Sequence, residues 1–172
     1  MTDHVLTTQS SASSRLLPRL LATSQDLAPV FLRAALAPVM FAHGAQKALG
    51  WFGGYGWSGS MGFLTGTIGL PGFAAAGVIL LELIGPVLLL AGLGTRPVAL
   101  GFAAIMAGAI ATVHAPFGFF MNWSGAQQGE GYEFHLLAIG IALALVVSGG
   151  GRWSADGRLL RAAAARERGQ PH

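Results

Sequence analysis

Apolar residues gather into four long runs along the chain, at about 29–50, 71–93, 97–115 and 132–148. Each run holds about 17–23 residues, or about 26–34 Å of α-helix, which matches a hydrocarbon core of about 30 Å. Apolar residues cover all sides of each run, and a helix satisfies its own backbone hydrogen bonds in lipid. The pattern therefore predicts an all-α, polytopic membrane protein built as a bundle of four transmembrane helices.

The segments outside these runs are polar. Residues 1–28 contain four serines ahead of Arg15 and Arg19 and lack an apolar core that ends in a cleavage site. We therefore expect a flexible lead-in there rather than a removed signal peptide. The predicted organisation is this lead-in, a four-helix transmembrane domain over 29–149 and a basic cytoplasmic tail over 150–172.

Positive charges fall on one side of the predicted bundle. The two loops expected at 51–70 and 116–131 contain no Lys or Arg. Cytoplasmic loops carry an excess of these residues, so both termini are predicted to be cytoplasmic in a multi-pass protein of the cell (inner or plasma) membrane. Arg33 is expected to snorkel to the inner interface. The arginines that set this orientation are Arg15, Arg19, Arg33, Arg96, Arg152, Arg158, Arg161, Arg166 and Arg168.

Composition narrows the function classes. Apolar residues make up 53% of the 172 residues and charged residues 10%, against about 25% charged in soluble domains. The net charge of +3 could indicate nucleic acid, but the arginines flank apolar runs, so we expect contact with membrane lipid and none with nucleic acid. The chain has no cysteine, which excludes disulfides, cysteine-ligated clusters and covalent c-type haem.

Ionisable residues interrupt the apolar runs. His43 and Lys47 lie four residues apart near the outer end of the first helix, so they share one face. Glu82 lies near the middle of the second helix, where a charge costs about 2.5–3.5 kcal/mol. It must be protonated, paired with Lys47 or a histidine, or bound to a ligand. Pro86 cannot donate to the carbonyl of Glu82, so we expect a kink that frees this acceptor.

The other ionisable groups also fall in the outer half of the bundle. His114 lies at the outer end of the third helix, and Glu133 and His135 lie at the start of the fourth. We hypothesise an outward-facing polar pocket. Its residues are His43, Lys47, Glu82, His114, Glu133 and His135. The plainer alternative is a snorkelling lysine, interfacial histidines and a purely structural ion pair at Glu82.

The two outer loops are rich in glycine and aromatic residues. Such loops are typical of an aromatic belt at the membrane interface. The alternative is a flexible apolar lid over the polar groups, through which a lipophilic molecule could enter. Under the second interpretation the loops contribute cofactor contacts from Trp51, Trp57, Phe119 and Asn122.

Several motifs together resemble one family. The pattern Phe41-x-His43-Gly44-x-x-Lys47-x-x-Gly50 resembles the signature at the end of the first helix in the DoxX family. The resemblance continues over about residues 28–160. It includes Glu82 and Gly85, Gly118-Phe119-Phe120 with Asn122, Gly131-Tyr132-Glu133 and the glycine-rich exit at Gly149-Gly150-Gly151.

The resemblance implies a quinone-linked oxidoreductase, because the family takes its name from a membrane subunit of a thiosulfate:quinone oxidoreductase. We expect a membrane quinone as cofactor and a soluble or membrane redox partner; a homo-oligomer is also compatible with so thin a bundle. Candidate donors to quinone carbonyls are His43, Lys47, His114 and His135. His43, Lys47, Glu82 and Glu133 are the catalytic candidates, with the carboxyls as proton relays.

Three alternatives stay open. The chain could be a non-catalytic anchor or assembly subunit, since it carries no redox group of its own. His43, His114, His135 and Glu82 could ligate zinc, iron or a haem, although no compact spacing favours it. Glu82 at mid-membrane beside a proline could instead serve transport of protons or a small solute.

Overall fold

The computed structural model describes residues 22–168, so most of the predicted lead-in and the last four residues lie outside the described part. Within this range the chain forms six α-helices with short 3-10 and π segments and no β-strand, which confirms the all-α prediction. Three helical stretches are long and apolar enough to cross a membrane: Ala28–Leu49, Gly72–Ala91 and Thr95–Phe117. A fourth apolar helix, Glu133–Ser148, is shorter.

Four helices make up the bundle. Proline in the first turn of α2 suits a position where no backbone donor is needed, and Gly50, in the left-handed region at φ 72°, ends that helix. The third span continues beyond its α-helical part through the π segment Ile110–His114 and the 3-10 turn Ala115–Phe117. The bundle helices are α2 (Ala28–Leu49), α4 (Gly72–Ala91), α5 (Thr95–Ala109) and α6 (Glu133–Ser148).

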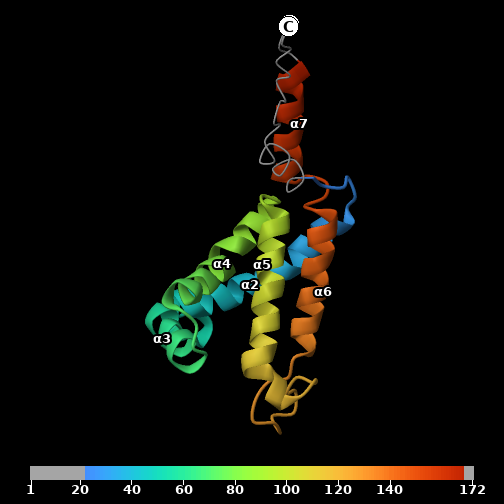
Figure 1. The fold of residues 1–172 in the computed structure, drawn as a ribbon. Coiled ribbons are helices and arrows are strands. Elements are labelled where there is room, and N and C mark those ends of the chain that lie inside the picture. Colours follow the sequence, from blue (N-terminus) through green and yellow to red (C-terminus); the bar gives the residue numbers. More distant parts are fainter. Residues whose placement is uncertain (1–21, 169–172) are drawn as a thin grey trace, which may run out of the picture.

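Two further helices lie outside the bundle. The segment between α2 and α4 is largely helical rather than irregular: it contains the 3-10 turn Trp51–Gly53, α3 (Gly56–Gly62) and the π segment Phe63–Thr67. At the other end, α7 (Ala155–Arg168) leads away from the bundle (Figure 1). We call the end that holds α3 and the loop before α6 the loop end, and the opposite end, which leads into α7, the terminal end.

The bundle consists of two helix pairs. Helix α2 packs mainly on α4, and α5 mainly on α6. Figure 1 shows the pairs meeting near the terminal end and diverging toward the loop end, where α2 and α4 run to α3 while α5 and α6 run to the other loop. Side chains of all four helices line a cavity in this loop-end half.

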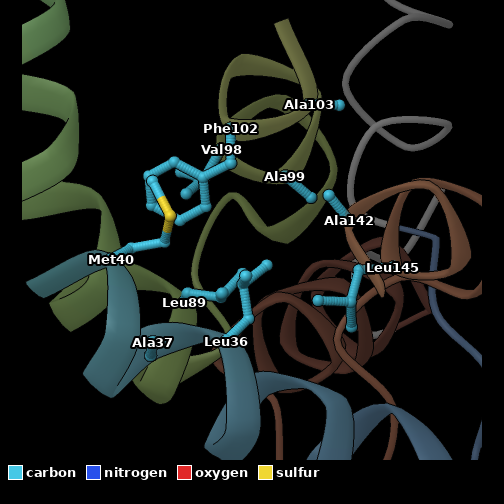
Figure 2. Packing of buried hydrophobic residues seen from close by; sticks show 10 residues of the cluster. All are labelled: Leu36, Ala37, Met40, Leu89, Val98, Ala99, Phe102, Ala103, Ala142 and Leu145. Carbon is cyan, nitrogen blue, oxygen red and sulfur yellow. The ribbon is translucent and has the colours of Figure 1, made fainter. Parts of the chain in front are cut away.

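The hydrophobic core joins all four bundle helices (Figure 2). Alanines at its centre let the helices approach closely, as small residues do in membrane bundles. Gly85 of α4 serves the same purpose, because a Cβ there would collide with the buried ring of Phe102. The core residues are Leu36, Ala37, Met40, Leu89, Val98, Ala99, Phe102, Ala103, Ala142 and Leu145.

A buried polar network closes the terminal end. The carboxylate of Asp156 accepts hydrogen bonds from the amides of Gly94 and Thr95, at 2.8 and 3.0 Å, and so caps α5. Arg33 does not snorkel as expected: it is buried and donates to the carbonyl of Leu90 at 3.1 Å, one of the last carbonyls of α4. Such carbonyls have no partner inside their own helix, so Arg33 stabilises the end of α4.

The chain on either side of the bundle joins this network. The amide of Ser24 donates to the carbonyl of Ser148 and that of Arg152 to the carbonyl of Asp26, both at 3.0 Å. Arg96 donates to the carbonyl of Val146 at 2.6 Å. The segment before α2 is therefore tied to the glycine-rich exit from α6.

Candidate functional site

An open cavity of about 900 Å³ lies between the helix pairs in the loop-end half. Its wall is mostly apolar and comes from α2, α4, α5 with its π segment, and α6. Six ionisable side chains interrupt this wall: His43, Lys47, Glu82, His114, Glu130 and His135. Five of the six residues expected in one pocket thus line one cavity, and Glu130 takes the place of Glu133.

Lys47 and Glu82 form an ion pair across α2 and α4. The Nζ of Lys47 lies 2.6 Å from Oε2 of Glu82, whose side chain is 1% exposed. The sequence left Glu82 protonated, paired with Lys47 or a histidine, or bound to a ligand, and the structure shows the pairing with Lys47. The side chain of Lys47 is 31% exposed, so the pair is accessible from its lysine end.

Gly44 explains how this ion pair can form. A Cβ at Gly44 would collide with the backbone carbonyl of Glu82, so the two helices touch backbone to backbone. Pro86 leaves that carbonyl without its usual helical donor. Helix α4 nevertheless runs across Pro86 as one helix, Gly72–Ala91, and the free carbonyl faces Gly44.

Two histidines pack together on the α5–α6 side of the cavity. The ring centroids of His114 and His135 lie 4.1 Å apart, with the planes inclined by 44°. Nδ1 of His114 lies 2.9 Å from the backbone carbonyl oxygen of Glu130. Nδ1 of His135 is buried and has no hydrogen-bond partner among residues 22–168. The cavity therefore has an ion pair on one helix pair and two imidazoles on the other.

Glu133 does not line the cavity. Its Oε1 accepts hydrogen bonds from the backbone amide of Met121, at 3.1 Å, and from the indole of Trp123, at 3.3 Å. Oε2 of Glu130 accepts one from the amide of Asn122 at 2.7 Å. The two carboxylates hold the second loop against the start of α6, so Glu133 acts on the loop in this structure, and its catalytic role stays a prediction.

The loop residues expected to contact a cofactor also lie outside the cavity wall. Trp51, Trp57 and Phe119 are exposed. The side chain of Asn122 bonds the backbone of Gln127 through both its amide nitrogen and its oxygen, each at 2.9 Å. The aromatic lining comes instead from Phe63, one of the aromatic residues of the first loop, and from Phe134. Phe134 directly precedes His135, and this adjacency was an available signal.

A second cavity of about 510 Å³ adjoins the first beneath α3. It shares Lys47, Phe63 and Leu64 with the larger cavity, so the lysine reaches both. Its other polar side chains are Gln46, Tyr55 and Ser60. The lysine of the ion pair thus borders both cavities.

The side chains do not converge as metal ligands. Over the described range, no group of three or more His, Asp or Glu side chains is placed to hold a metal ion. The sphere of three histidines and one carboxylate considered from the sequence is therefore not assembled in this structure. The cavity offers hydrogen-bonding and proton-carrying groups instead.

Comparison with known proteins identifies the family. The DoxX family profile matches residues 28–115, a range that contains His43, Lys47, Glu82 and His114. A protein of Bacillus subtilis (strain 168) named "Putative oxidoreductase CatD" is 35% identical over 127 residues, which cover 73% of this chain and 83% of that protein. No solved structure matches the chain. The chain belongs to the DoxX family and is a multi-pass membrane protein.

Proposed function

We propose that the chain is the membrane subunit of a quinone-linked oxidoreductase and that the large cavity holds the quinone head group. The observation that supports this most is the joint lining of one open, mostly apolar cavity by an ion pair and a histidine pair. Its volume of about 900 Å³ falls within the usual range for small-molecule sites, about 300–1,000 Å³. The oxidoreductase name of the Bacillus subtilis relative agrees with this proposal.

The lining residues fit such a ligand. When bound, a quinone would supply two-electron, two-proton redox chemistry. Lys47 has ammonium donors beyond the one directed at Glu82 and can bond a carbonyl, and His43 lies one turn below it on the same face of α2. Glu82 can hold a proton beside Lys47. The electrons would come from a soluble or membrane redox partner, since the chain has no cysteine-ligated cluster.

We further propose four spans, with both described ends on the cytoplasmic side of the plasma membrane. Helix α6 packs along α5, so it would cross the bilayer beside it despite its 16 residues. The terminal end carries Arg33, Arg96 and the arginines of α7, whereas Lys47 is the one Lys or Arg at the loop end within the described residues. This distribution follows the positive-inside rule.

The test is the quinone content of protein purified in mild detergent. We expect quinone to co-purify with the wild type and to be lost from the variants His43→Ala and Glu82→Gln. Arg161→Ala on α7, far from the cavity, is the matched control and should retain it. Absence of quinone from the wild type, together with no saturable binding of added quinone, would rule the proposal out.

One observation favours a second candidate, a non-catalytic anchor for a redox complex. Helix α7 leads away from the bundle and exposes Arg158, Arg161 and Arg166 to a possible partner (Figure 1). Activity of the isolated chain separates the two candidates. Quinone reduction by the purified chain with an artificial electron donor supports the first, and activity that appears only with a co-purifying protein supports the second.

A further inference from the structure

The hydrogen bond of His114 determines which of its nitrogens carries the proton. Nδ1 lies 2.9 Å from the carbonyl oxygen of Glu130. A carbonyl oxygen only accepts hydrogen bonds, so Nδ1 must donate. In the neutral ring the other nitrogen, Nε2, then carries a lone pair and no hydrogen. Nε2 has no hydrogen-bond partner in the described part of the chain, and His114 lines the cavity.

The loop around Glu130 keeps this arrangement in place. Oε2 of Glu130 accepts a hydrogen bond from the amide of Asn122, at 2.7 Å, so the Glu130 side chain is held by the loop. The amides of Tyr132 and Glu133 bond the carbonyls of Gly118 and Phe119, at 3.2 and 2.9 Å. The carbonyl that orients His114 therefore belongs to a loop that is tied down on both sides.

The two polar walls of the cavity differ in what they can bind. The Lys47–Glu82 pair offers both a donor and an acceptor, so it can bond either a carbonyl or a hydroxyl. Neutral His114 offers the cavity an acceptor alone. His135 has a buried Nδ1 without a partner, so no contact selects one of its tautomers. Of these two packed imidazoles, His114 is thus the one whose tautomer is set by a contact in the described part of the chain.

We propose that the cavity distinguishes the two redox forms of its ligand, and that Nε2 of His114 accepts a hydrogen bond from a hydroxyl of the reduced, dihydroxy form. This inference rests on the proposed function. A quinol carries hydroxyl donors, one of which can face the lone pair. A quinone carries only acceptors, and its carbonyl oxygen opposite Nε2 gains no hydrogen bond. The contact at neutral His114 therefore favours quinol over quinone.

The test compares quinol and quinone binding in matched variants of the full chain. The amide nitrogen of Asn can replace Nδ1 toward Glu130, so His114→Asn keeps that bond but removes the acceptor. His114→Gln places an amide oxygen near the position of Nε2 and serves as the rescue variant. The probes are a short-chain benzoquinol, kept reduced without oxygen, and its quinone, titrated into detergent-purified protein at about pH 8, above the ordinary pKa of histidine.

We expect His114→Asn to weaken quinol binding about tenfold, as loss of one buried hydrogen bond does, and to change quinone binding less than about twofold. His114→Gln should restore most of the quinol affinity. An equal change for both forms, or no change for either, overturns this inference and leaves the proposed function standing. A wild type that binds neither form overturns the proposed function and this inference with it.

A second measurement tests the premise without a ligand. Nitrogen NMR of protein labelled in histidine distinguishes a ring nitrogen that carries hydrogen from one that does not. We expect one neutral histidine with hydrogen on Nδ1, and we expect its signals to disappear in His114→Asn. If the signals that disappear belong to a ring with hydrogen on Nε2, the inference is overturned even when the variants fold poorly.

Discussion

At the scale of single residues, the charged side chains around the cavity depend on one close backbone contact and on the hydrogen bonds of a loop. The spacing of His43 and Lys47 places both on one face, and the depth of Glu82 demands compensation. Whether Lys47 or a histidine supplies it depends on how closely α2 approaches α4, and Gly44 allows that approach. Glu130 lines the cavity and Glu133, which was expected there, does not. Hydrogen bonds within the loop orient both side chains, and such bonds follow no sequence periodicity.

The first prediction concerns this close approach. We expect Gly44→Ala to destabilise the protein by about 1–3 kcal/mol, as overpacking does, because the new Cβ would collide with the backbone of Glu82. Gly77→Ala in α4 is the matched control, since a Cβ there meets nothing within 4 Å. Thermal unfolding in detergent measures both. An equal Tm for the two variants would contradict the contact.

The ion pair gives the second prediction. Lys47→Met should leave a buried carboxylate without its cation and lower stability by about 3 kcal/mol, at the low end for a buried pair because Lys47 is partly exposed. The double variant with Glu82→Gln removes both charges and should recover much of that loss. Chemical denaturation of the single and double variants completes the cycle. If the two losses simply add, the residues are not coupled.

At the scale of elements, hydropathy predicts the long helices because each apolar run must satisfy its backbone in lipid. It does not predict α3 or the two π segments. The stretch that forms α3 and the first π segment is rich in glycine and aromatic residues, which carry little helical signal. The second π segment, Ile110–His114, continues the third apolar run, and hydropathy does not distinguish a π turn from an α turn. The run Ala162–Ala165 favours a helix in the C-terminal segment, where α7 lies, since alanine is the best helix former. The arginines around that run were interpreted only as charges that orient the protein in the membrane.

The third prediction tests how α7 is joined to the bundle. Asp156→Ala should remove the cap on the amides of Gly94 and Thr95 and cost about 1–2 kcal/mol. Amide deuterium exchange should rise at the start of α5 while α2 keeps its protection. Asp156→Asn retains an acceptor oxygen and should have a smaller effect. Unchanged exchange at the start of α5 would show that the cap is dispensable.

At the scale of the whole molecule, charge and hydropathy together predict a bundle with distinct ends, but not its interior. The cavity lies in the half where the helix pairs diverge, and no sequence period records that divergence. The buried network of Arg33 and Asp156 also escapes prediction, because arginines near helix ends ordinarily reach water. Residues from distant parts of the chain supply their partners.

The fourth prediction concerns orientation, and the absence of cysteine from the sequence makes it clean to test. We expect Ser124→Cys, in the exposed loop before α6, to react with a membrane-impermeant maleimide on intact cells. Ala163→Cys, exposed on α7, should react only after the membrane is opened. Labelling in the reverse order would invert the topology, and labelling of both on intact cells would contradict the count of four spans.

The closed terminal end has an energetic consequence. Among the described residues, the core around Leu89 and Leu145 and the Arg33 network separate the cavity from the terminal end. A proton taken up at Lys47 or Glu82 therefore enters and leaves on the loop side. With an electron donor that also acts from the loop side, turnover in this pocket would be electroneutral, and a voltage-sensitive dye in reconstituted vesicles should show no change; a donor docked at the terminal end would instead move electrons across the bundle and charge the bilayer.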